Sequence, residues 1–176
     1  MEVFEKLLDP ELYAYFKNAT FYENPVFHTA HKMVDFYIEF ENVIPLEIYE
    51  QIITKLQLSL HAHVKLHMHT KNSVIEMDEL DRYVNFFVEK YSDVKDFRFL
   101  HPYLENDTIC FSTRDESRLA ALNLALPSLM EKLADVGITQ EIVCKKVEDD
   151  IEIETAKVQV STPVVKQEPV KKQYPS

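Results

Sequence analysis

Hydrophobic and polar residues alternate along residues 34–41, and the period then changes to that of a helix. One side of the predicted strand comprises Val34, Phe36, Ile38 and Phe40, and the other Asp35, Tyr37, Glu39 and Glu41. Pro45 ends the strand because it has no N–H to donate to a sheet, and it suits the first turn of a helix. Apolar residues then recur at helical spacing from Tyr49 to Leu60. This stretch predicts a strand that packs directly against a helix.

A second alternating stretch covers residues 62–70. Its inward positions are Val64, Leu66 and Met68, and its outward positions are His61, His63, Lys65, His67 and His69. Further helices are predicted over residues 77–91 and, with Thr113 or Asp115 as the N-cap, towards Val136, where Gly137, the single glycine, provides a left-handed cap. Residues 3–16 predict a short helix interrupted at Asp9-Pro10, and residues 20–27, 108–112 and 139–147 predict strands. The expected fold is α+β, a small mixed sheet with about three packed helices.

The composition divides the chain into three segments. Residues 1–30 carry the N-terminal helix and the first strand, and residues 31–147 form the main α+β domain. Residues 148–176 begin with acidic residues and continue with Pro, Val, Lys and Gln. Such a segment buries too little apolar surface to offset the entropy lost on ordering, so we expect a linker there that leads to a longer protein.

The net charge is −11, and the last segment does not account for it. Six of the 30 acidic and four of the 19 basic residues follow Lys146, so residues 1–146 have a net charge of −9. A surface of this sign repels phosphates, which argues against a direct nucleic-acid partner. Residues 1–10 are charged and do not resemble a signal peptide, and the apolar runs of the sequence are shorter than a membrane span. Cys110 and Cys144 are expected to be buried thiols and not a disulfide, which is typical of the reducing cytoplasm.

The outward histidines His61, His63, His67 and His69 are candidate metal ligands, because histidines at alternate positions of a strand share one face. The ordinary interpretation is a solvated face of the sheet, and nothing nearby in the sequence completes a closed zinc site. A free-standing α+β domain that binds a metal through this row is the alternative function. A single glycine excludes a P-loop and a dinucleotide fingerprint. We find no catalytic residues and expect no cofactor.

Several stretches resemble the N-terminal region of PolC, the replicative DNA polymerase III α subunit of low-GC Gram-positive bacteria. The similar stretches within residues 34–147 and just beyond are FYIEF (36–40), the Val43-Ile44-Pro45 corner, LHAHVKL (60–66), TICFSTRDESRLAALN (108–123) and DVGITQEIVCKKVEDDIE (135–152). The resemblance implies a non-catalytic N-terminal segment of an enzyme that synthesises DNA and proofreads with a 3′–5′ exonuclease.

The resemblance also implies a fold similar to a truncated type II KH domain, as in the C-terminal domain of the clamp-loader τ subunit and the N-terminal domain of the initiator DnaA. A nucleic-acid-binding KH domain needs a Gly-x-x-Gly loop, which this chain lacks. The resemblance therefore favours a protein–protein module of the replisome, with τ as the expected partner. Direct binding of single-stranded nucleic acid is disfavoured by the charge.

Five aromatic residues lie outside the predicted helical stripes and are candidates for a partner-binding surface: Phe21, Tyr22, Phe97, Phe99 and Tyr103. An exposed apolar patch larger than scattered surface residues would support that role. The alternative is that these side chains close the edges of the core.

Overall fold

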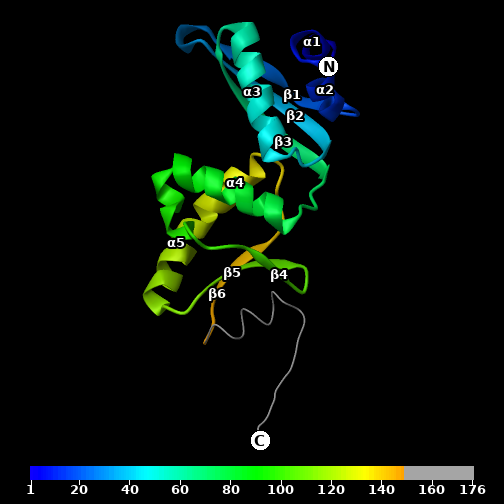
Figure 1. Ribbon diagram of the computed structural model, residues 1–176. Coiled ribbons are helices and arrows are strands. Elements are labelled where there is room, and N and C mark those ends of the chain that lie inside the picture. The colour runs from blue at the N-terminus through cyan, green and yellow to red at the C-terminus, as the bar shows by residue number, and fades with distance from the viewer. Residues whose placement is uncertain (149–176) are drawn as a thin grey trace, which may run out of the picture.

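The structure, a computed structural model, describes residues 1–148. Its class is α+β, as predicted, but its strands form two mixed three-stranded sheets and not the single sheet expected. Figure 1 shows the first sheet with α3 at one end of the molecule, the second sheet at the other end, and α4 and α5 between them. We call residues 1–72 the N-terminal half and residues 77–148 the C-terminal half.

The N-terminal half contains a sheet of order β1-β2-β3. Its elements are α1 (Glu2–Leu7), α2 (Pro10–Tyr13), the 3₁₀ turn η1 (Ala14–Phe16), β1 (Thr20–His28), the 3₁₀ turn η2 (Thr29–His31), β2 (Met33–Asn42), α3 (Leu46–Leu60) and β3 (His63–Asn72). β1 pairs antiparallel with β2, and β3 pairs parallel with β2 after the crossover through α3. The helix break at Asp9-Pro10 and the helix start after Pro45 are confirmed.

One face of the first sheet forms the core of this half, with the alternation that the sequence predicts. The buried side chains are Val34, Phe36, Ile38 and Phe40 of β2 and Val64, Leu66 and Met68 of β3. The helices cover this face: Phe4 packs on Phe36, and Phe16 packs on Phe40, each with ring centroids 5.0 Å apart. α3 adds Ile52 and Leu56. The opposite face of the sheet is consequently left without a helical layer of the N-terminal half.

The C-terminal half repeats the same order of strands and connections. Its elements are α4 (Met77–Lys90), the 3₁₀ segment η3 (Ser92–Phe97), β4 (Tyr103–Glu105), β5 (Thr108–Thr113), α5 (Glu116–Ala134) and β6 (Ile142–Lys146). β4 pairs antiparallel with β5, and β6 pairs parallel with β5 after the crossover through α5. Each half therefore begins with helical structure and continues with a strand–strand–helix–strand unit.

The boundaries of α5 follow from the residues at its ends. The Asp115 side chain accepts a hydrogen bond from the Ser117 N–H at 2.9 Å, which is an N-cap. The helix continues through Pro127 to Ala134. Gly137 follows with φ +88°, the left-handed conformation that the sequence predicts for it.

Side-chain and backbone contacts join the two halves. The Met68 N–H donates to the Asp135 carbonyl at 3.0 Å, and the Thr70 hydroxyl donates to the Gly137 carbonyl at 2.7 Å. On the other side, the buried Tyr83 hydroxyl donates to the Ile44 carbonyl, and the Leu46 N–H donates to the Glu79 carboxylate at 2.8 Å. The end of β3 is thus held against the segment that follows α5.

Three predictions from the sequence concern the N-terminal segment, the C-terminal linker and the absence of a membrane-spanning segment. β1 pairs with β2, so the N-terminal segment predicted over residues 1–30 contributes a strand to the sheet that residues 31–72 complete. The linker predicted over residues 148–176 lies, except for Glu148, outside the described residues. No helix within residues 1–148 is long and apolar enough to cross a membrane.

Candidate functional site

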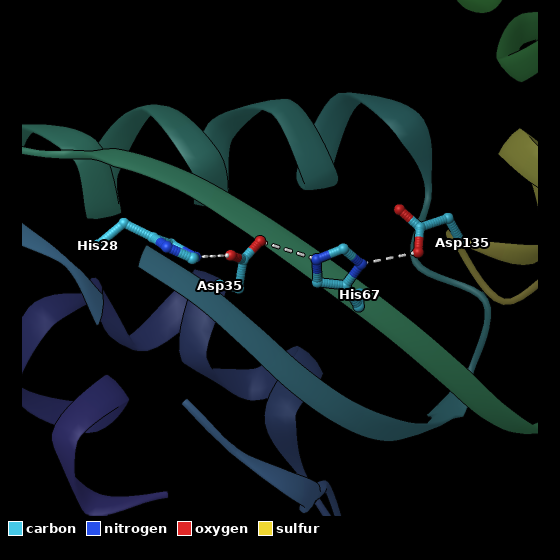
Figure 2. Close-up of polar contacts among 4 residues, drawn as sticks. All are labelled: His28, Asp35, His67 and Asp135. Atoms are coloured by element: carbon cyan, nitrogen blue, oxygen red, sulfur yellow. Dashed lines mark hydrogen bonds and ion pairs between the residues drawn. The ribbon is translucent and has the colours of Figure 1, made fainter. Parts of the chain in front are cut away.

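The uncovered face of the first sheet carries a row of titratable side chains that spans all three strands and the end of α5. His28 comes from the end of β1, Asp35 from β2, His67 from β3, and Asp135 from the C-terminus of α5. We call these four residues the His–Asp row, and Figure 2 shows them in line. The antiparallel register brings His28 near Asp35, and the parallel register sets Tyr37 opposite His67.

Three short polar contacts connect the row. His28 Nε2 lies 2.8 Å from Asp35 Oδ2, and His67 Nε2 lies 2.9 Å from Asp35 Oδ1. His67 Nδ1 lies 2.9 Å from Asp135 Oδ1. Both nitrogens of one imidazole therefore face carboxylate oxygens that belong to different halves of the molecule (Figure 2).

His67 has a carboxylate oxygen within hydrogen-bond distance of each of its two ring nitrogens. A neutral imidazole has one N–H donor and one acceptor nitrogen, whereas the imidazolium has two donors. Ionised carboxylates only accept hydrogen bonds, so the imidazolium alone satisfies both Asp35 and Asp135. The ring of Tyr37 stacks on His67 with centroids 4.6 Å apart and an interplanar angle of 11°.

Asp35 is the centre of the row and is 9 % exposed. Burial raises the pKa of its carboxyl group, but the hydrogen bonds with His67 and His28 outweigh burial and hold the pKa below the ordinary value. Asp35 is thus an ionised, nearly buried carboxylate with two imidazole partners.

Two tyrosines flank the row on the same face. Tyr22 packs against Tyr37 with centroids 5.8 Å apart and against His69 at 3.7 Å. Burial raises the pKa of both phenols, and nearby carboxylates raise it further: Asp135 and Glu23 for Tyr22, and Asp35 and Glu23 for Tyr37. The phenols remain protonated near neutral pH and act as hydrogen-bonding aromatic surface.

A half-open cleft of about 580 Å³ adjoins the row between the two halves. Its walls come from α3, β3, α4 and α5, with aromatic side chains from Tyr49, Phe86, Phe87 and Tyr91. His67 and Asp135 lie in its lining with Lys65, Lys90 and Lys132. Burial, followed by the charge of Asp135, raises the pKa of Tyr49 to about 12. The row therefore lies where the cleft and the uncovered sheet face meet.

The four histidines of the predicted row have different positions and contacts in the structure. His61 has φ +53° and ends α3, and His63 is exposed at the start of β3. His69 packs on Tyr22, and His67 joins the His–Asp row. Within residues 1–148, no group of three or more His, Cys, Asp or Glu side chains is placed so that it could hold a metal ion. Cys110 and Cys144 are both free thiols.

The five candidate aromatic residues lie in two places and do not form one patch. Phe21 and Tyr22 belong to β1, where Phe21 reaches the core through Phe4. In the C-terminal half, Phe97 ends η3, Phe99 follows it, and Tyr103 begins β4. Phe97 is fully buried against Phe111, with ring centroids 5.0 Å apart, which corrects the expectation that it lies at the surface.

Phe99 has the opposite environment. Its side chain is 82 % exposed, and its backbone has φ +68°, a conformation that few residues with a Cβ adopt. Arg118 Nη2 donates to the carbonyls of Asp96 and Arg98, each at 3.0 Å, and so holds the segment before Phe99. The Arg98 guanidinium lies 5.8 Å from the Phe99 ring centroid. Phe99 is thus an exposed aromatic side chain on a restrained backbone.

Sequence reasoning missed His28, Asp35, Asp135 and Arg118. Asp35 and His28 have ordinary positions on an alternating strand, and Asp135 ends a helix, so each has a local explanation. Their importance comes from contacts with residues distant in sequence. His28 and Asp35 are 7 positions apart, Asp35 and His67 are 32 apart, and His67 and Asp135 are 68 apart. No local pattern in one sequence could have identified these pairs.

One comparison with known proteins finds a similarity, and it lies in the first half of the chain. Residues 2–70 match the family model described as DNA polymerase III polC-type N-terminus I. The match includes FYIEF and LHAHVKL and extends to the N-terminal helices, whereas residues 108–123 and 135–152 lie outside it. No curated protein and no solved structure matches the chain, so the KH-like fold stays a prediction. Residues 2–70 are therefore similar to the N-terminus of PolC-type DNA polymerase III.

Proposed function

We propose that this segment of a replicative DNA polymerase III is a non-catalytic module that contacts another replication protein, with the clamp-loader τ subunit as the partner. DNA synthesis and 3′–5′ proofreading would then belong to other regions of a full-length, cytoplasmic enzyme. The family match supports the polymerase context, and the contact role depends on a feature of the C-terminal half.

The main support for a protein–protein contact is the exposure of the Phe99 side chain. A large aromatic side chain in water forfeits the free energy of burial, about 1.5–3 kcal/mol for a Phe. The left-handed backbone costs roughly a further 1–2 kcal/mol for a residue with a Cβ. Because strained, exposed positions concentrate at functional sites and aromatic anchors dominate protein interfaces, Phe99 is the best candidate for an interface anchor.

The charge of the chain supports a protein partner over a nucleic acid. The net charge of −11 gives an unfavourable long-range field for phosphates. The two arginines beside this segment also have partners within the protein: Arg98 pairs with Glu89 at 2.7 Å, and Arg118 donates to the Asp96 and Arg98 carbonyls, each at 3.0 Å. A partner with an apolar pocket for the Phe99 ring fits these surroundings.

A calorimetric titration of the 176-residue chain with τ tests this proposal. We expect saturable one-to-one binding that Phe99→Ala weakens by roughly tenfold or more, as for an interface anchor. The matched control is Leu124→Ala, because Leu124 is also exposed (84 %) but lies on a regular helix. Absence of heat and of co-elution at high concentration would reject τ as the partner.

Phe99→Gly separates a binding role from a folding role. Glycine adopts a positive φ without strain, so this variant should match or exceed the wild-type free energy of unfolding while it loses binding. A large decrease in the free energy of unfolding would instead assign Phe99 to the fold and remove the main support for the proposal.

A further inference from the structure

The connection between the two halves passes beside His67. The Met68 N–H, next in sequence to His67, donates to the Asp135 carbonyl at 3.0 Å, and the Asp135 side chain faces His67 Nδ1 at 2.9 Å. Met68 and Val136 also form an isolated parallel bridge. Asp135 therefore contacts β3 through both its backbone and its side chain. Any change in the side-chain contact acts at the same place as the backbone contact.

The two carboxylates that face His67 differ in their access to water. The Asp35 side chain is 13 % exposed, and the Asp135 side chain is 42 % exposed. His28 faces Oδ2 of Asp35, so His67 is the partner of Oδ1. Leaving Oδ1 of this nearly buried carboxylate without a donor costs more, because water has little access to replace the lost hydrogen bond there. When His67 has a single proton, that proton therefore stays on Nε2 towards Asp35. The lone pair on Nδ1 then faces the Asp135 carboxylate, and the two acceptors repel each other.

Charged and titratable groups surround His67 on every element packed near it. They are Tyr22, Glu23 and His28 on β1, Asp35 and Tyr37 on β2, Lys65 and His69 on β3, Tyr49 and Glu50 on α3, Lys90 and Tyr91 on α4, and Glu131, Lys132 and Asp135 on α5. Lys132 is paired with Asp93, and Lys90 lies over the Phe86 and Tyr91 rings. Asp35 and Asp135 are the carboxylates in direct contact with the imidazole.

We propose that His67 is a proton-dependent latch between the two halves of the molecule. With two N–H groups, His67 ties Asp35 of the N-terminal half to Asp135 of the C-terminal half. Loss of the Nδ1 proton releases the Asp135 side chain to water and weakens the adjacent Met68–Asp135 backbone bond. The end of α5 then loosens from β3 at the rim of the inter-half cleft. The latch goes beyond the proposed partner contact and does not depend on Phe99.

Nuclear magnetic resonance of the 176-residue chain tests the latch between about pH 5 and about pH 9, where a histidine changes charge and carboxylates stay ionised. The ¹⁵N shifts of the ring report which nitrogen of His67 carries a proton. Amide exchange, expressed as a protection factor at each pH, reports the Met68–Asp135 bond. We expect two ring protons at the low end, the Nε2–H tautomer at the high end, and a roughly tenfold or greater loss of Met68 protection along the same pH curve.

Two variants separate the latch from a general pH effect. Asp135→Asn offers an amide that donates to or accepts from Nδ1, so Met68 protection should no longer follow the charge of His67. His63→Gln, on the same strand but exposed, should leave the coupling unchanged. An Nδ1–H tautomer for neutral His67, or Met68 protection that stays constant while His67 in the unmodified chain loses its proton, would overturn the proposal without reliance on any variant.

Discussion

The two halves of the molecule have the same strand order but use it differently. In both, two antiparallel strands are followed by a helix and a third strand parallel to the middle one. The strands of the first sheet have 9 or 10 residues, whereas β4, β5 and β6 have 3, 6 and 5. Long strands provide a wide second face, and in the first sheet that face carries the His–Asp row.

The middle strand of the second sheet buries apolar side chains on both of its faces. Ile109, Cys110 and Phe111 are buried in succession, so both faces of β5 are covered at this point. In the first sheet, Val34, Asp35 and Phe36 of β2 are also buried in succession, but the residue on the second face is the charged Asp35. Further along β2, core residues alternate with the half-buried polar positions Tyr37 and Glu39. The comparison teaches that one topology can bury both faces of a short sheet or keep one face of a long sheet for polar chemistry. The C-terminal half instead places its exposed aromatic residue, Phe99, on a loop.

The largest expected effect comes from removing a core aromatic ring from either half. Phe40 packs on Phe16, and Phe111 packs on Phe97, and both Phe40 and Phe111 are fully buried. Phe40→Ala and Phe111→Ala should each lower the free energy of unfolding by about 3–5 kcal/mol. Chemical denaturation followed by fluorescence and by circular dichroism should show one coincident transition, because contacts join the halves. Two separate transitions, each sensitive to one variant, would show that the halves unfold independently.

A smaller effect is expected at the contact between Gly137 and β3. A Cβ at Gly137 would lie 2.5 Å from Thr70 Cγ2, and φ is +88°. Gly137→Ala should therefore cost about 2–4 kcal/mol through overpacking and left-handed strain. Adding Thr70→Ser removes the clashing methyl group and keeps the hydroxyl that donates to the Gly137 carbonyl. We expect partial recovery of the melting temperature in the double variant, and no recovery would indicate that strain alone sets the cost.

The smallest expected effect is the acid dependence due to Asp35. Its pKa is lowered in the folded protein, so its ionised form stabilises the fold above the ordinary aspartate pKa, and this contribution is lost as pH falls through the folded value. Asp35→Asn should cost about 1 kcal/mol near neutral pH and should reduce the loss of stability below about pH 4. Urea unfolding from pH 7 to pH 2 measures both. A variant with an unchanged acid profile would exclude Asp35 as a source of the pH dependence.

Much of the local structure could be predicted from the sequence because periodicity reports which side of an element is buried. The alternation around Phe36 predicted β2, the helical stripe after Pro45 predicted α3, and the single glycine marked the left-handed residue after α5. The number of sheets was predicted incorrectly. Periodicity states that a strand has a buried face but contains no information about which strand lies beside it.

The candidate sites show the same division between local and non-local information. The sequence by itself determined that His67 faces away from the apolar core of the first sheet, because strand residues alternate between faces. Only the tertiary structure decided that Asp35 and Asp135 occupy its two nitrogens, that Phe97 is buried and that Phe99 is exposed. The physical reason is the distance along the sequence over which each effect acts. Backbone geometry fixes the direction of a side chain locally, whereas its partners come from segments that only the folded chain brings together.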